Sequence, residues 1–247
     1  MNLLLLEPAE VGPGGEARLA GRRARHVREV LRCDPGDRIA AGVVNGLAGE
    51  AEVLAATSEE LVLRVALDRP PPPPSPVGLL LALPRPKILR RVLQAVAAMG
   101  VKQVVLLGSY RVEKSYWSSP LLSPEALRQE LLLGLEQGKD TALPAVTLER
   151  FFKPFVEDRL DLALPGARLL ADPGAPGRLG ALPAPAGGVA VAIGPEGGWT
   201  PYEAAELAKR GFFPVSLGPR PLRVDQVVPF AVGQAELWLS LREGGPA

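Results

Sequence analysis

The feature that most constrains the fold is a proline run, because six of the seven residues from 70 to 76 are proline. Consecutive prolines favour extended polyproline II and act as a stiff spacer. The sequence pattern also changes across this run. We therefore predict one domain over residues 1–69, a linker over 70–76 and a second domain over 77–247.

Short β-like runs dominate the first part of the chain. They cover residues 2–6, 38–44, 50–56 and 60–67. They alternate with glycine-bearing turns, of which Asn45-Gly46 is a strong hairpin signal. One helix is expected from about Gly21 to Leu31. This pattern predicts a small β-barrel that carries a helix.

Strands and helices alternate after the prolines. Apolar runs predict strands at 77–83, 104–107, 168–171, 189–193 and 212–217. Helices are expected at 86–99, from Ser123 to about Glu136, and from Val224 to about Leu241. Alternation of this kind is typical of an α/β domain with a parallel sheet covered on both faces.

A glycine loop follows the buried strand at 189–193. Gly194-Pro195-Glu196-Gly197-Gly198 lies between that strand and a helix opened by Thr200 as N-cap, Pro201, and Glu203, which would complete a capping box. Such a loop brings backbone close to a ligand at the carboxyl edge of a sheet. An ordinary tight turn is the alternative interpretation.

The loop differs from the common phosphate fingerprints, because it has neither Gly-x-Gly-x-x-Gly nor Lys-Ser/Thr after the glycines. It also carries a carboxylate, Glu196, so a ligand with positive charge or hydroxyl groups fits better. A second loop, Gly218 to Arg223, follows the next strand and is rich in Gly, Pro and Arg. In a parallel sheet both loops emerge at the same edge.

The two loops together resemble those of SPOUT methyltransferases, and in particular the ribosomal RNA small-subunit methyltransferase E family. The resemblance also includes His26 to Arg32 with Pro35-Gly36-Asp37, then Lys87, Gly100-Val101 and Glu136-Gln137. It implies S-adenosylmethionine-dependent methylation of N3 of a uridine in small-subunit ribosomal RNA. It also implies a PUA-like β-barrel, a trefoil knot in the C-terminal sheet and a homodimer with a composite active site.

The resemblance places the cofactor against the two loops. The residues implied to bind S-adenosylmethionine are Gly194, Pro195, Glu196, Gly197, Gly198, Leu217, Gly218 and Leu222. Where the family usually continues Leu-Arg with Thr-Glu-Thr-Ala, this chain has Val224-Asp225-Gln226-Val227 after Leu222-Arg223. The role of this segment is therefore open.

Methylation of uracil N3 requires removal of a weakly acidic proton or stabilisation of the resulting anion. A guanidinium near the carbonyl groups would stabilise that anion, and Arg223 is our candidate. Asp225 or Glu196 could be the base. No metal is expected, since one His and one Cys make a zinc site improbable.

Arginines crowd the N-terminal segment although the chain's net charge is only +1. Such clusters can neutralise phosphates, and a second basic group opens the helix at 86–99. The candidate RNA contacts are Arg22, Arg23, Arg25, His26, Arg28, Arg32, Lys87 and Arg91. For each of them a solvated helix face is the alternative. The partner would be ribosomal RNA or the small ribosomal subunit.

Composition sets the remaining expectations. A hydrophobic content of 47% with 22% charged residues is typical of a soluble globular protein. No apolar segment approaches membrane-spanning length, and the single Cys33 favours a cytoplasmic protein. Two other function classes stay open: a non-catalytic RNA-binding ribosome assembly factor that retains the methyltransferase fold, and an unrelated α/β nucleotide-binding enzyme.

Overall fold

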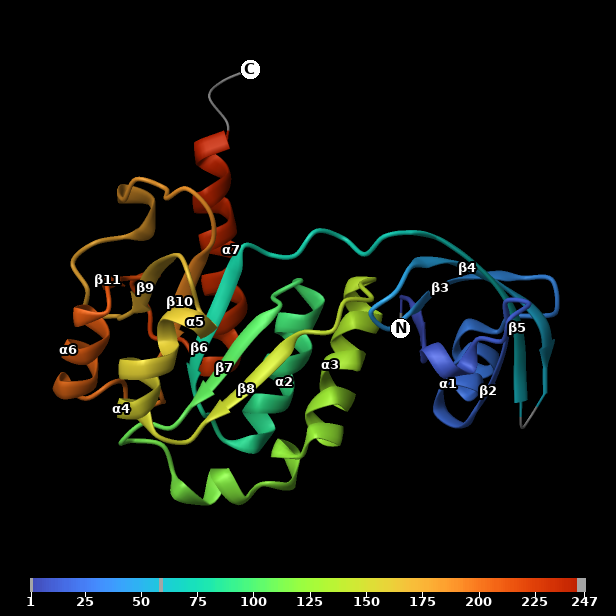
Figure 1. Ribbon diagram of the computed structural model, residues 1–247, viewed down its shortest axis with the longest axis horizontal. Coiled ribbons are helices and arrows are strands. Elements are labelled where there is room, and N and C mark those ends of the chain that lie inside the picture. Colours follow the sequence, from blue (N-terminus) through green and yellow to red (C-terminus); the bar gives the residue numbers. More distant parts are fainter. Residues whose placement is uncertain (1, 58–59, 244–247) are drawn as a thin grey trace. The chain divides into compact units, whose positions relative to one another are not determined.

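The computed structural model describes residues 2–57 and 60–243, with side chains as far as Leu241 (Figure 1). The chain divides into two compact units. The first contains the residues up to Pro73 together with Leu132–Leu143, and the second contains Pro74–Leu131 and the chain from Pro144 onward. The change of unit at Pro73 lies inside the predicted linker, whereas the return of Leu132–Leu143 to the first unit was not predicted.

The first unit is built on a mixed five-stranded sheet in the order β1-β3-β4-β5-β2. Its strands are β1 (Leu4–Leu6), β2 (Glu16–Ala20), β3 (Arg38–Val43), β4 (Ala48–Ala56) and β5 (Glu60–Arg69). β1 runs parallel to β3, and the other pairs are antiparallel. The predicted helix is present as α1 (Gly21–His26), which continues as a π-helical turn over Val27–Leu31.

Alternation of side chains explains the core of this unit. In β2, Ala17 and Leu19 are buried while the residues between and beside them are exposed, as period-2 alternation requires. They pack with Leu4, Leu61 and Leu63. The segment from Leu132 to Leu143 is tied to the β3–β4 turn, because Thr141 Oγ1 donates to the Gly46 carbonyl at 2.6 Å.

The second unit has a six-stranded, wholly parallel sheet in the order β11-β9-β10-β6-β7-β8. The strands are β6 (Val77–Ala82), β7 (Gln103–Leu107), β8 (Ala145–Glu149), β9 (Ala167–Ala171), β10 (Val189–Ile193) and β11 (Phe212–Val215). All five residues of β10 are buried. The predicted α/β parallel sheet is thus confirmed, and β8 is an additional strand that was not predicted.

The helices of the chain after the linker are α2 (Pro86–Ala98), α3 (Pro124–Gly138), α4 (Phe152–Pro154), α5 (Leu160–Ala163), α6 (Pro201–Lys209) and α7 (Val224–Glu243). Shorter helical turns occupy Pro8–Glu10, Lys114–Ser118, Pro120–Leu122, Phe155–Arg159 and Leu179–Ala181. Leu80, Phe155, Ala192 and Leu207 belong to the central apolar cluster of the second unit. Among the described residues, no helix combines the length and the apolarity needed to cross a bilayer.

Candidate active site at the carboxyl edge of the parallel sheet

The glycine loop after β10 is held as a tight turn. Gly198 adopts φ 73°, a left-handed conformation that suits glycine, and its N–H donates to the Pro195 carbonyl at 2.7 Å. Arg111, from the segment after β7, donates from Nη1 to the Gly197 carbonyl and reaches the Gly198 and Trp199 carbonyls at 3.5 Å. Arg111 therefore fixes the outer side of the loop.

The loop ends in the predicted capping box. Thr200 Oγ1 accepts from the Glu203 N–H at 3.2 Å, and the Glu203 carboxylate accepts from the Thr200 N–H at 2.9 Å. The same carboxylate accepts from the Tyr110 N–H and the Thr200 hydroxyl, both at 2.8 Å. Glu203 is only 3% exposed, so one buried carboxylate joins the glycine loop, α6 and the segment after β7.

The second loop joins β11 to α7 at the same edge of the sheet. Gln234 of α7 donates to the Leu217 carbonyl at 2.9 Å, which fixes the start of the loop. At the other end, the Arg223 carbonyl accepts from Gln226 and Val227 at 2.9 and 2.8 Å, so Arg223 is the residue at which α7 begins. Gln226 Oε1 accepts in return from the Arg223 N–H at 3.4 Å.

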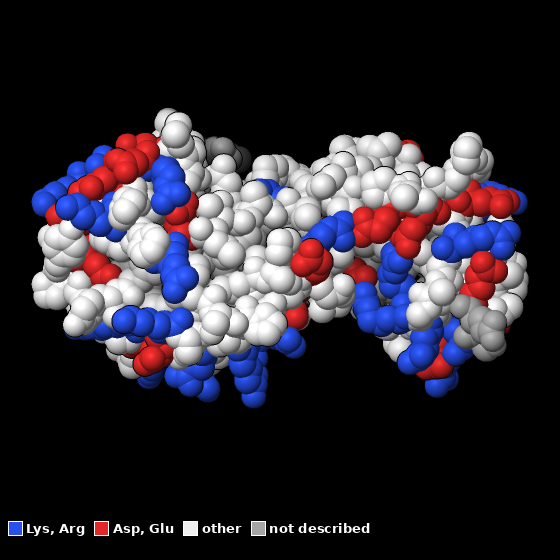
Figure 2. Space-filling view, turned by 60° about the horizontal axis from the view of Figure 1, so that its bottom comes forward, with Lys and Arg blue, Asp and Glu red and all other residues white. Residues whose placement is uncertain are grey.

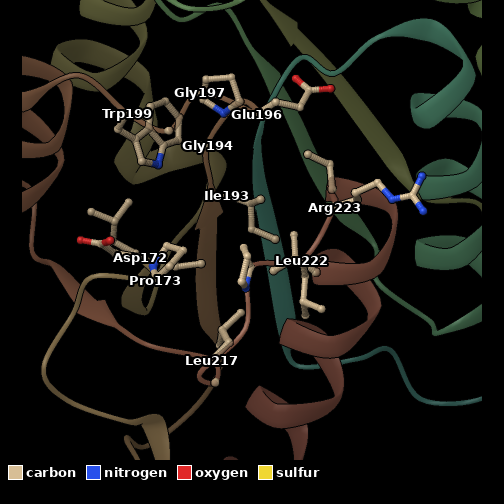
Figure 3. Close-up of a pocket in the computed structure, with 18 of the residues that line it drawn as sticks. Asp172, Pro173, Ile193, Gly194, Glu196, Gly197, Trp199, Leu217, Leu222 and Arg223 are labelled. Carbon is tan, nitrogen blue, oxygen red and sulfur yellow. The ribbon is translucent and has the colours of Figure 1, made fainter.

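A cavity of about 530 Å³ lies between the two loops (Figure 3). All eight residues predicted to bind the cofactor line it, and so does Arg223. Asp172 and Pro173 after β9, Trp199 and Arg220 also line the cavity and were not predicted as site residues. Asp172-Pro173-Gly174 follows a predicted strand at the same edge, and that position was the signal that could have identified it.

The mostly apolar wall of the cavity carries several unpaired hydrogen-bond donors. In the described part of the chain, the backbone N–H groups of Gly194, Leu217 and Leu222 have no protein partner. The indole Nε1 of Trp199 is buried and likewise unpartnered within those residues. A cavity of this size, with few polar groups on apolar walls, is typical of a small-molecule site.

Two carboxylates at or near the cavity pair with arginines at the start of α2 and within it. Glu196 accepts from Arg85 Nε at 3.3 Å, and the Asp225 carboxylate accepts from Arg91 Nη1 at 2.8 Å. Asp225 is not among the residues that line the cavity; its side chain is 12% exposed and its Oδ1 has no partner among the described residues. Figure 3 shows Glu196 and Arg223 on one side of the cavity and Asp172 and Trp199 on the other.

The predicted RNA contacts fall into different environments. In the first unit, Arg22 pairs with the buried Glu136 at 3.0 Å, and Arg23 pairs with Glu10 and donates to the Leu5 carbonyl at 2.8 Å. Figure 2 shows basic and acidic side chains intermixed on this part of the surface. Two of the predicted contacts therefore hold the unit together.

The other candidates differ in exposure. Arg28 pairs with Glu29 at 2.6 Å, while His26 has a buried Nε2 that lacks a partner within the described residues. Burial lowers the pKa of His26. Arg25 and Arg32, and Lys87 on α2, are exposed, and none of the described residues pairs with their side chains.

The sequence and the fold define the protein class. Residues 71–235 match the model of an RNA methyltransferase domain. The chain is 32% identical to the ribosomal RNA small subunit methyltransferase E of Treponema pallidum, over 91% of this chain and 86% of that protein. It is 30% identical to the enzyme of the same name from Synechocystis, over 87% and 71%. The chain belongs to the ribosomal RNA small subunit methyltransferase E family.

Solved structures share the fold over almost the whole chain. The ribosomal RNA small subunit methyltransferase E of Neisseria gonorrhoeae, bound to S-adenosyl methionine, superimposes with a TM-score of 0.75 at 21% identity and covers 96% of this chain and 97% of that one. A methyltransferase of Legionella pneumophila in complex with the bound cofactor SAM gives 0.73 at 22% identity, with the same coverage.

Proposed function

We propose that the protein transfers the methyl group of S-adenosylmethionine to N3 of a uridine in small-subunit ribosomal RNA. The observation that carries the proposal is the cavity between the two loops, in a chain that belongs to this methyltransferase family. Both similar structures named above hold the same cofactor. The uridine N3 target comes from the sequence resemblance.

The residues of the cavity fit S-adenosylmethionine. The unpaired N–H groups of Gly194, Leu217 and Leu222 would donate to its acceptor atoms, and the apolar walls would cover its base. A Cβ on Gly218 would meet no protein atom within 4 Å, so the space beside that glycine is free for a ligand. When bound, the cofactor supplies an electrophilic methyl group on a sulfonium.

Arg223 and Glu196 are our assignments for the reaction at uracil N3. Both line the cavity, and no described residue pairs with the Arg223 guanidinium. Arg223 would face the uracil carbonyls and stabilise the negative charge that develops as N3 loses its proton. Glu196, 41% exposed at the cavity edge, would accept that proton.

Asp225 receives a different assignment. Its carboxylate is bound to Arg91 and it stands outside the cavity lining, two residues into the helix that Arg223 opens. We therefore assign to the Arg91–Asp225 pair the positioning of the start of α7, and with it of Arg223. Arg25, Arg32 and Lys87 remain the candidates for phosphate contact, because their charges have no described acidic partner.

A homodimer belongs to the same proposal. The side chains of Phe230, Leu237 and Leu241 are 45%, 62% and 64% exposed, and their spacing places them on one stripe of α7. Such a stripe suits a two-fold contact with a second copy. The proposal also includes the trefoil knot, the PUA-like first unit and the composite active site, which the resemblance implies. Sedimentation of Leu237→Glu against wild type tests the contact, and a monomeric wild type refutes it.

The cofactor site is tested by calorimetry. Gly218→Val places a side chain in the free space of the cavity, and we expect the affinity for S-adenosylmethionine to fall at least tenfold. Gly187→Val is the matched control, because Gly187 also has a positive φ (98°, against 156° at Gly218), a Cβ there also meets no atom within 4 Å, and Gly187 does not line this cavity. Equal affinity in two folded variants would refute the site.

A further inference from the structure

A second cavity, of about 590 Å³, opens beside the first at the carboxyl ends of β7 and β8. Three aromatic residues on its lining are strongly exposed: Tyr110 (87%), Phe151 (66%) and Tyr202 (53%). The chain has twelve Phe, Trp and Tyr residues. A folded chain normally buries such side chains, so three exposed rings around one cavity indicate a binding surface.

The rings come from three different segments of the second unit. Tyr110 follows β7 and Phe151 follows β8, two parallel strands that lie side by side in the sheet (Figure 1). Tyr202 lies in the first turn of α6. The Glu203 carboxylate, which accepts from the Tyr110 N–H at 2.8 Å, joins the first and third of these segments. The segments that carry Tyr110 and Tyr202 are therefore linked by the protein itself.

Basic side chains line this cavity, and the carboxylates near it already have partners. Arg150 and Lys153 line it; Arg150 has no partner among the described residues, and Lys153 reaches only the exposed Glu157 at 3.8 Å. The two buried carboxylates nearby are bound to other groups of the protein. Glu203 is buried with three hydrogen bonds, and Glu149 is buried and paired with Arg159 at 2.7 Å.

The new cavity is adjacent to the cofactor cavity but distinct from it. Trp199 lines the first cavity, Phe152 lines the second, and their ring centroids are 6.1 Å apart. The lining also includes Ser109, whose buried hydroxyl has no partner among the described residues.

We propose that this second cavity binds unpaired nucleotides of the RNA substrate, next to the one that is methylated. Bases would stack on Tyr110, Phe151 and Tyr202, and the phosphates would lie near Arg150 and Lys153. Stacking on exposed rings combined with basic side chains is how proteins hold single-stranded nucleic acid. An apolar protein partner would leave Arg150 without a counter-charge. This inference rests on the proposed function, because it assumes an RNA substrate.

The test measures the affinity of the full chain for a single-stranded RNA of about 20 nucleotides by fluorescence anisotropy. Tyr110→Ala and Phe151→Ala remove rings that are mostly exposed, so the fold is retained. Each should weaken binding by roughly 5- to 150-fold, the equivalent of one lost stacking contact. Tyr110→Phe keeps the ring and should keep the affinity. Phe213→Ala, on β11 and 50% exposed, is the matched control outside the cavity.

A second arm tests the cations. Arg150→Gln should flatten the dependence of log affinity on log salt by up to about 0.7 for one lost contact with a single strand. Lys209→Gln, which removes an exposed cation elsewhere in the unit, should leave that slope unchanged.

The outcomes separate the two proposals. A wild type that binds no RNA would refute the proposed function and this inference together. A wild type that binds and methylates RNA, with undiminished affinity in Tyr110→Ala and Phe151→Ala, would overturn only the inference. A protein partner lost in these variants while RNA affinity stays constant would also overturn it. Selective loss of RNA affinity, with unchanged calorimetric affinity for S-adenosylmethionine, would support it.

Discussion

Removal of the Glu203 carboxylate should loosen the glycine loop from the rest of the sheet edge. Its three accepted hydrogen bonds, at 2.8, 2.9 and 2.8 Å, come from Tyr110 and Thr200, and the side chain is 3% exposed. A hydrogen bond to a charged group contributes about 1.5–3 kcal/mol, and a stranded buried donor costs about 1–3 kcal/mol. Since the Thr200 hydroxyl can turn to another acceptor, we expect Glu203→Ala to lower the free energy of unfolding by roughly 3–5 kcal/mol.

Glu203→Gln keeps one carbonyl acceptor and should cost about half as much. Both values come from urea denaturation, where the midpoint should fall without a change in slope. Glu206→Ala is the control in the same helix, because that carboxylate reaches only Lys209. The affinity for S-adenosylmethionine should fall with the stability, since the loop that Glu203 anchors lines the cavity. The reasoning is refuted if Glu203→Ala and Glu206→Ala lie within about 0.5 kcal/mol of each other, the usual spread for substitutions that touch no special feature.

Three further expectations concern charged and titrating groups. Arg91→Gln leaves the mostly buried Asp225 without its counter-ion and should lower the free energy of unfolding, measured in urea, by about 1–3 kcal/mol. The double variant Arg91→Gln/Asp225→Asn should recover part of that loss. If the effects of the two single substitutions simply add, the pairing is contradicted. Burial acts to raise the pKa of Glu10, but the hydrogen bonds from Arg23 and from the Glu7 N–H lower it overall. The Glu10–Arg23 pair therefore stabilises the fold above pH 4.5, and this contribution is lost as the pH falls through the folded-state pKa of Glu10. An acid titration of stability should therefore be flatter in Glu10→Gln, and identical curves would count against it. Burial, followed by the charges of Asp37 and Asp34, raises the pKa of Cys33 above its usual value, so iodoacetamide should react with it more slowly at pH 8 than with a free thiol. A reaction midpoint at or below that of the free thiol would disagree.

Local chemistry explains what the sequence predicted well. The start of α6 follows from Thr200, Pro201 and Glu203, three residues whose capping bonds lie within one turn. The buried strand β10 follows from its unbroken apolar run, and the shared edge of the two loops follows from the parallel order of the strands that precede them. The eight residues that the family resemblance implied for the cofactor all line one cavity.

Contacts between distant residues explain what the sequence did not predict. Strand β8 is an edge strand with mostly exposed or half-buried residues, so it lacks the apolar run that identified its neighbours. Arg91 and Asp225 are 134 positions apart, and Arg22 and Glu136 are 114 apart. Nothing in the composition around Arg22 indicates that its charge is satisfied inside the unit, which is why the arginine cluster was predicted as an RNA surface.

The central claim is tested most directly by the chemical identity of the product. Small ribosomal subunits that lack the modification would be incubated with the protein and isotopically labelled S-adenosylmethionine, and the nucleosides of the ribosomal RNA analysed by mass spectrometry. We predict a single labelled product, 3-methyluridine, that is lost in Arg223→Ala and much reduced in Gly218→Val. A label on another base, on a ribose hydroxyl, or no label at all from a protein that binds both the cofactor and the RNA, would contradict the account.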